Sequence, residues 1–204
     1  MAVLLDHPLS HGGPAVPTAE RRGCRESPGA ILVDVADRLR IEPLESRRLT
    51  LDPLGVVHSQ EMAPILADPS IYDFIDGPPL TPAQVRSRYE RLEAGSPDPS
   101  VKWLNWVIRC QAQRALVGSL QATVWPDQGQ AEVAWIVGTA WQGQGIATEA
   151  AGTVVRWLQR QGIRAVIAHI HPDHGASQAV ARRIGLQPTA KVVEDEIEWR
   201  AELA

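Results

Sequence analysis

The sequence predicts an α+β domain, in which helices cover both faces of a mixed, mostly antiparallel sheet. Three observations support this. The composition, 44% hydrophobic and 22% charged, is that of a globular protein. Strand-like segments in the middle of the chain follow one another through short turns, as in an antiparallel meander. Helical segments then alternate with one apolar run, residues 165–170, which is typical of a central strand covered on both faces.

The first segments alternate strand and helix patterns. Residues 48–54 alternate apolar and polar positions and predict a half-buried strand, and residues 60–66 predict a short helix. Thr81 is a good helix cap, with Pro82 at the first helical position and Gln84 three residues after the cap, so a helix is expected to about Glu93.

The later elements follow from periodicity and glycine stops. We expect a helix that begins after Gly145 and ends before Gly162. Strands are expected at residues 103–110, 116–124, 131–137 and 165–170, a short helix at 176–184, and a terminal hairpin at 189–193 and 196–203.

The 204 residues suit one domain and a tail. Residues 1–29 are rich in proline, glycine and arginine without hydrophobic periodicity, so we expect a poorly ordered tail followed by a single domain at 30–204. The apolar run at residues 31–35 is expected to add a strand or to dock on the domain.

Composition also excludes several classes of function. A net charge of −4 argues against a nucleic-acid binder, which needs a basic face. No stretch approaches the roughly 20 apolar residues of a membrane span, and Asp6 and His7 interrupt the position of a signal peptide. Cys24 and Cys110 are too few and too far apart for a disulfide framework. The sequence therefore predicts a cytoplasmic protein without membrane or nucleic-acid partners.

The junction after the strand at 131–137 is the most informative segment. Its turn holds Gly143 and Gly145, and a helix follows at once. Such a turn leaves backbone N–H groups unpaired at the positive end of a helix, which suits a pyrophosphate, although a plain strand-to-helix turn has the same pattern. A dinucleotide-binding turn is disfavoured, because no carboxylate ends the next strand, which reads His169-Ile170-His171.

Residues 142–147 read Gln-Gly-Gln-Gly-Ile-Ala. They match the Q/R-x-x-G-x-G/A signature of the GNAT superfamily of acyl-CoA N-acyltransferases, which the chain resembles in several further segments. Four further segments resemble the branch that contains ribosomal-protein N-terminal acetyltransferases. They are residues 131–135, residues 141–150, His-Pro-Asp-His-Gly-Ala-Ser at 171–177 and Arg-Ile-Gly-Leu at 183–186. The resemblance covers residues 45–204.

The resemblance implies acetyl-CoA as the donor. Its pyrophosphate would lie on the turn, and its pantetheine would lie along the splayed end of the strand at 131–137, bound to the main chain of Ile136 and Val137. The expected cofactor-binding residues also include His174 and the whole turn: Gln142, Gly143, Gln144, Gly145, Ile146, Ala147 and Thr148.

The resemblance also implies catalytic roles. Glu132 matches a strand carboxylate that acts as general base; the alternative is a salt-bridged structural Glu. Ser177 matches a serine proposed to protonate the leaving thiol, or else it caps the short helix. Ala181 stands where many relatives have a Tyr acid, which strengthens Ser177 and His174 as candidates. His174 itself replaces the usual Asn and is either a cofactor contact or a turn substitution.

The acceptor site is less defined. Trp106 and Trp141 are candidates for an aromatic wall, and Asp73 and Asp76 are candidates to hold an ammonium group, although a buried core and a solvated loop explain them as well. A zinc site formed by His169, His171, His174 and Asp173 is disfavoured for want of a rigid third ligand. No metal is expected.

The sequence thus predicts an N-acetyltransferase that transfers acetyl from acetyl-CoA to a primary amine, with Glu132 as base. A small-molecule acceptor is favoured, because the chain lacks a basic surface for docking on ribosomes. A protein N-terminus as acceptor, a non-catalytic acyl-CoA-binding regulator and, more remotely, an NAD-type oxidoreductase stay open. A homodimer is an open alternative to a monomer, because dimers are common in this family.

Overall fold

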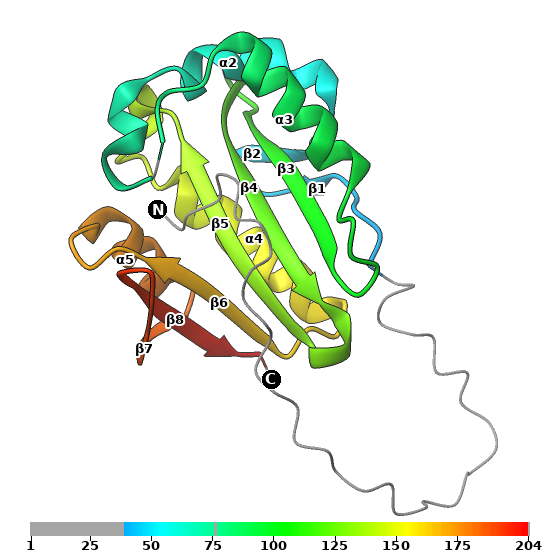
Figure 1. Cartoon of the computed structure of the whole chain (residues 1–204), viewed down its shortest axis with the longest axis vertical. Helices are drawn as coiled ribbons and strands as arrows, with labels where there is room; N and C mark the ends of the chain where they lie inside the picture. The colour runs from blue at the N-terminus through cyan, green and yellow to red at the C-terminus, as the bar shows by residue number, and fades with distance from the viewer. Residues whose placement is uncertain (1–38, 76, 204) are drawn as a thin grey trace, which may run out of the picture.

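The computed structural model describes residues 39–75 and 77–203, which form an eight-stranded sheet with helices on both faces (Figure 1). The strand order is β1-β2-β3-β4-β5-β6-β8-β7, and every neighbouring pair is antiparallel except β5 and β6. The strands are β1 Leu44–Glu45, β2 Leu49–Pro53, β3 Lys102–Cys110, β4 Ala115–Trp125, β5 Gln130–Val137, β6 Ala165–Ile170, β7 Gln187–Val193 and β8 Glu196–Glu202. The predicted fold class is confirmed.

Helices α2 and α3 lie on one face of the sheet, and α4 lies on the other (Figure 1). The α-helices are α2 Ser59–Leu66, α3 Pro82–Ala94, α4 Ile146–Arg160 and α5 Gly175–Arg183, and the 3₁₀ turns are η1 Val56–His58, η2 Pro69–Phe74, η3 Pro126–Gln128 and η4 Thr139–Trp141. Each face has its own core. Val107 and Ile136 pack under α2 and α3, whereas Val133 and Val166 pack against α4.

The sequence-based boundaries agree with these elements to within two residues. The expected cap of α3 is confirmed, since Thr81 and Gln84 form a capping box. The two-residue strand β1 and the 3₁₀ turns were not predicted. The expected tail at 1–29, its boundary with the domain and the run at 31–35 lie outside the described residues. In the described part of the chain, no helix is both long enough and apolar enough to cross a bilayer.

Strands β5 and β6 separate along their length. They pair only from Gln130 to Glu132 on β5, opposite Ala165 to Ile167 on β6, so the carboxyl-terminal half of β5 has no partner on that side. On its other side, Gly118 of β4 lies opposite Val137. A Cβ at Gly118 would overlap the main-chain oxygen of Ile136. The glycine therefore lets β5 press close to β4 where it parts from β6.

Candidate active site

The turn between β5 and α4 presents open main-chain amides. Gly143 and Gly145 have φ of 73° and 76°, a left-handed conformation that favours glycine, and residues 142–145 are exposed. Among the described residues, none accepts a hydrogen bond from the amides of residues 143–148. Those amides lie at the positive end of the 15-residue helix α4, so the turn can bind an anion such as a pyrophosphate.

Gln142 contributes to this turn in another way than expected. Its own amide donates to Thr139 O at 3.2 Å, and its side-chain Nε2 donates to Val137 O at 3.0 Å. These bonds fold the turn back onto the end of β5. Gln142 therefore shapes the anion site, and its main-chain amide is not open to a ligand. The predicted contacts Ile136 and Val137 lie on the part of β5 that has separated from β6.

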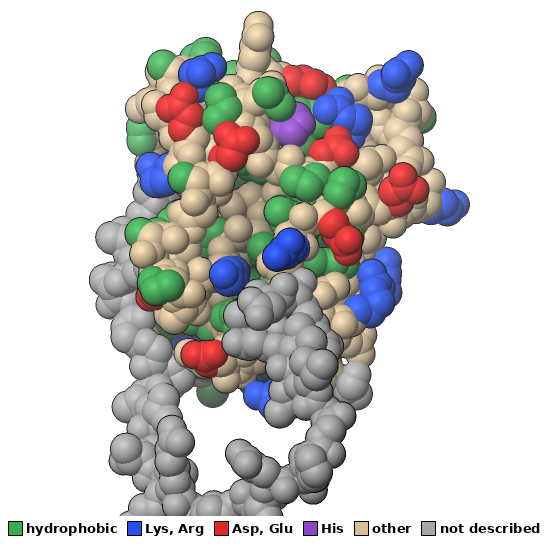
Figure 2. All heavy atoms as spheres, turned by 90° about the vertical axis from the view of Figure 1, so that its right-hand side faces the viewer, with side chains coloured by type: hydrophobic (Ala, Val, Ile, Leu, Met, Phe, Trp, Pro, Cys, Tyr) green, Lys and Arg blue, Asp and Glu red, His purple; other side chains and the backbone are tan. Residues whose placement is uncertain are grey.

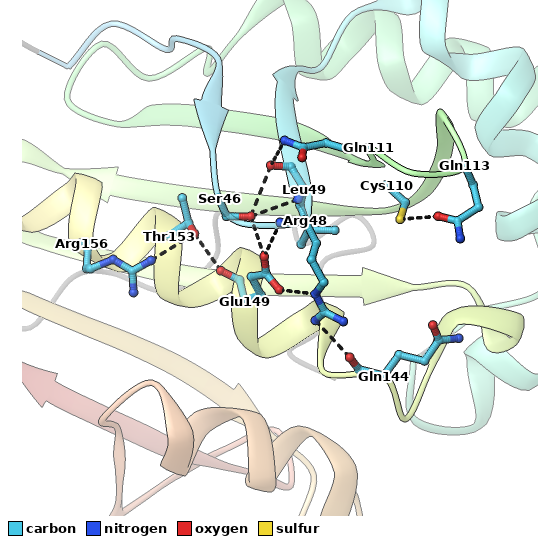
Figure 3. A network of polar contacts seen from close by, with 10 residues as sticks. All are labelled: Ser46, Arg48, Leu49, Cys110, Gln111, Gln113, Gln144, Glu149, Thr153 and Arg156. Atoms are coloured by element: carbon cyan, nitrogen blue, oxygen red, sulfur yellow. Dashed lines mark hydrogen bonds and ion pairs between the residues drawn. The ribbon is translucent and has the colours of Figure 1, made fainter.

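A polar network ties the turn to the β1–β2 connection (Figure 3). Glu149, in the first turn of α4, accepts hydrogen bonds from Ser46 Oγ at 2.9 Å, Arg48 N at 2.9 Å and Arg48 Nε at 2.7 Å. Arg48 Nη2 also donates to Gln144 O at 3.1 Å. Burial opposes ionisation of Glu149, but the bonds from Arg48 and Ser46 outweigh it and lower its pKa. These bonds hold the turn in position and leave its main-chain amides open.

Glu132 faces the start of the opening between β5 and β6. Its Oε1 lies 2.9 Å from His169 Nδ1 on β6, and the two side chains are 23% and 15% exposed. His169 Nε2 lies 4.0 Å from Glu198 Oε2 on β8, which also binds Lys191 Nζ at 2.8 Å. A row of polar groups thus crosses the sheet from β5 to β7.

The charge on His169 responds to its neighbours. Burial lowers its pKa, but the hydrogen bond and charge of Glu132, together with Glu198 and Glu196, outweigh burial, so the pKa is raised. The ring is thus drawn towards its charged form between carboxylates. It also fixes one oxygen of Glu132 and leaves the other free to meet a proton.

His174 lies across from η2 at the beginning of α5. Its ring stacks on Phe74 with centroids 4.4 Å apart, and the His171 ring lies 5.4 Å from Phe74. Burial lowers the pKa of His174 to about 4, so it is neutral near pH 7. Ser177, in the first turn of α5, is 4% exposed, and its side chain forms no hydrogen bond with the described residues. Both predicted acids therefore lie beside the β6–α5 loop.

The structure does not bring the three described acceptor candidates, Trp106, Trp141 and Asp73, into one site. Trp106 is wholly buried against Trp157 on the α4 face, and its Nε1 donates to Glu42 O at 2.9 Å. It therefore belongs to the core and cannot contact an acceptor. Trp141, in η4, lines a pocket together with Arg48, Cys110 and Ile146. Asp73 is exposed in η2, and Asp76 lies outside the described residues.

Two groups of residues were missed by the sequence analysis. The first is the partner of Glu132, because the sequence analysis considered His169 only as a metal ligand. The second is a set of polar side chains on β3 and β4 beneath α3, which includes Asn105 and Gln121. The described residues contain no cluster of three or more His, Cys, Asp or Glu side chains suited to a metal.

Comparisons with known proteins agree with this geometry. The family model described as "Acetyltransferase (GNAT) domain" matches residues 48–187. No curated protein matches the chain. An acetyltransferase of the GNAT family from Bacillus anthracis is 16% identical, with a TM-score of 0.66 over 78% of this chain and 96% of that one.

Two further solved structures were determined with coenzyme A compounds. RimL, the ribosomal L7/L12 α-N-protein acetyltransferase, in complex with coenzyme A, is 18% identical, with a TM-score of 0.67 over 79% of this chain and 98% of its own. The microcin C7 self-immunity acetyltransferase MccE, in complex with acetyl-CoA and AMP, is 14% identical, with a TM-score of 0.66 over 77% and 93%.

The family match covers more than two thirds of the sequence, and the chain therefore belongs to the GNAT acetyltransferase family. It is an acyl-CoA-dependent N-acetyltransferase, and acetyl-CoA is its co-substrate. The residues present fit that co-substrate, because open amides at a helix terminus adjoin a strand that has parted from its neighbour.

Proposed function

We propose that this enzyme acetylates a primary amine by direct transfer, with Glu132 as the base that receives the proton of the amine. The observation that carries the proposal is the pair of Glu132 and His169, joined at 2.9 Å where β5 and β6 separate. A carboxylate in this place meets the requirement for a neutral acceptor amine.

Each part of the site then has one task. Acetyl-CoA supplies an acetyl group activated as a thioester. The amides of residues 143–148 bind the pyrophosphate, and the free edge of β5 near Ile136 and Val137 orients the pantetheine. Glu132 accepts the proton from the amine, and His169 holds the Glu132 carboxylate in place. Of the two predicted acids, Ser177 is the candidate to return a proton to the departing sulfur, because His174, with a pKa of about 4, carries no acidic proton near pH 7.

Surface charge bears on the acceptor. On the face of the molecule turned to the viewer in Figure 2, acidic and basic side chains are interspersed and no extended basic patch is present. This face therefore offers no basic docking surface for a nucleic-acid-rich particle, and together with the net charge of −4 it supports the small-molecule acceptor favoured by the sequence. The likeness to RimL keeps a protein N-terminus as the second candidate.

A thiol-release assay tests the proposal. The full chain is incubated with acetyl-CoA and a panel of primary amines, and mass spectrometry looks for products heavier by one acetyl group. We expect amine-dependent release of coenzyme A. Binding of acetyl-CoA by calorimetry without turnover of any amine would contradict catalysis and support the regulatory alternative.

A further inference from the structure

Three neutral polar side chains lie beneath α3 on the sheet face that carries Glu132. Asn105 of β3 is the cross-strand partner of Gln121 of β4, and Ser119 lies two residues before Gln121 on the same face. Gln121 is in turn opposite Ala134 of β5, two residues after Glu132. Because side chains two residues apart on a strand share a face, Asn105 and Gln121 occupy the row next to that of Glu132, and Ser119 lies in the row beyond it.

Asn105 has no partner for its amide. The residue is 5% exposed, and neither its Oδ1 nor its Nδ2 has a hydrogen-bond partner among the described residues. Ser119 and Gln121 form no side-chain hydrogen bonds with the described residues either. Buried polar groups in proteins are almost always paired, so an unpaired donor and acceptor on one side chain call for an explanation.

These side chains line a cavity of about 30 Å³ under α3. A single water needs ~10–15 Å³ on this measure, so the space admits a small polar group. Apolar residues, including Leu66, Leu92 and Tyr89, form much of the remaining wall. Arg88 is the single charged residue among the described ones that line the cavity, so no acidic side chain there attracts a second cationic centre.

We propose that this cavity recognises an amide next to the reacting amine, so that the acceptor is an α-amino amide. This inference rests on the proposed function. A side-chain amide offers one donor and one acceptor side by side, and another amide complements that pair better than a hydroxyl or a carboxylate does. Asn105 and Gln121, which lie opposite each other on β3 and β4, each provide one such donor and acceptor. The acceptor then places its amine towards Glu132 and its amide beneath α3.

Two sources share this chemistry, namely amides of single amino acids and the first peptide group of a protein or peptide N-terminus. A substrate series on one carbon skeleton tests the class. Alaninamide, alanine, alaninol and 2-aminopropane differ only in the group beside the amine. Rates are compared at saturating acetyl-CoA and corrected for the fraction of neutral amine, because the four amines differ in basicity.

We expect kcat/KM for alaninamide to exceed that for the other three by at least about tenfold, in line with rejection of ligands that leave site groups unpaired. Equal values, or a preference for alanine or alaninol, would overturn the inference. Absence of turnover with every amine would instead reject the proposed function on which it rests. The tripeptide Ala-Gly-Gly then identifies the source: a higher kcat/KM than alaninamide indicates a peptide N-terminus, and a lower one a small amide.

Substitution of Asn105 separates recognition from folding. In Asn105→Leu the unpaired donor and acceptor are both removed, so the protein should unfold at the same or a higher temperature. The preference for alaninamide should nevertheless disappear, with KM for acetyl-CoA unchanged. Gln121→Met should act in the same direction, and Gln128→Met, an exposed glutamine in η3, is the matched control. Retention of the preference in Asn105→Leu would refute the assignment.

Discussion

The two halves of the proposed site use different chemical groups, main-chain amides in one and side chains in the other. In the proposed site, the turn at residues 143–148 binds acetyl-CoA with main-chain amides, and its side chains matter little so long as Gly143 and Gly145 keep their left-handed conformation. The other proposed half, around Glu132, uses side chains brought together from β3, β4, β5 and β6. Changes in the first half should therefore affect acetyl-CoA binding, and changes in the second should affect the acceptor and the chemistry.

The largest effect should come from a side chain at Gly145. In Gly145→Val a β-branched residue is forced to φ near 76° at the beginning of α4, which distorts the turn. We expect acetyl-CoA affinity to fall by about 100-fold or more, which corresponds to about 2.7 kcal/mol, as measured by calorimetry.

The matched control for this change is Gly152→Ala within α4. A Cβ there meets Arg156 Nη1 at 3.3 Å, the end of a flexible side chain, and alanine favours the helix. This variant should bind acetyl-CoA normally. If Gly145→Val also bound it normally, the assignment of the turn would be wrong.

The second effect in size concerns the proposed base. Glu132→Gln keeps the shape of the side chain and removes its ability to accept a proton, so kcat should fall by about 10²–10³-fold, within the range for general bases. Acetyl-CoA affinity should stay within about twofold of the parent. Full activity of this variant across pH would remove Glu132 as base. If Glu132→Gln instead bound acetyl-CoA more weakly, the two halves of the site would not act separately.

The same contrast explains what the sequence could predict. The turn has a local signature, because glycines and a helix start are adjacent in the chain, and the structure places open amides there as expected. Periodicity and the Thr81 cap likewise predicted most of the helices and strands, since these depend on short-range patterns.

Contacts between distant strands carry no such signature. The pairing of Glu132 with His169 depends on the β5–β6 register, and the partner of Trp106 depends on which face of β3 meets α4. The alternation of side chains along a strand does not by itself say whether the face that carries Trp106 is buried in the core. The sequence also did not predict that β4 requires glycine at position 118, because this requirement arises from the close approach of β5 in the folded chain.

A third prediction concerns His169 and pH. His169→Gln keeps a donor for Glu132 but cannot carry charge, so we expect kcat to fall about tenfold, by less than in Glu132→Gln. His169 has a raised pKa, so the stability it contributes is complete below its unfolded pKa of about 6.5 and is lost as pH rises through the folded value. The parent should exceed the variant by about 1–2 kcal/mol at pH 5.5, and by less at pH 8.5.

Urea unfolding at both pH values measures this difference. Besides Glu132, the charged groups that face His169 are Glu198 and Glu196, and Lys191 partly neutralises Glu198. The control is His58→Gln in η1, which should leave kcat unchanged. If the difference in unfolding free energy between the parent and His169→Gln instead grew towards pH 8.5, the ring would be stabilised in its neutral form, contrary to the proposed pairing.

The smallest effect should come from the network behind the turn. Glu149→Gln retains an acceptor oxygen but loses the charge that strengthens its bonds to Ser46 and Arg48. The network positions the turn but does not bond to its main-chain amides. We therefore expect KM for acetyl-CoA to rise about three- to tenfold, with kcat nearly unchanged. Stability should fall by about 1 kcal/mol near pH 7, since the pair is partly exposed.

The pH dependence distinguishes this effect from a general loss of stability. Glu149 has a lowered pKa, so its contribution is present above the unfolded value and disappears as pH falls through the folded one. The parent and Glu149→Gln should therefore converge in acid, in the opposite direction to His169→Gln. Glu90→Gln removes an exposed ion pair with Arg86 and should change neither KM nor stability appreciably. If Glu149→Gln lowered kcat and left KM for acetyl-CoA unchanged, the network would serve the chemistry, and the division of the site into a main-chain half and a side-chain half would fail.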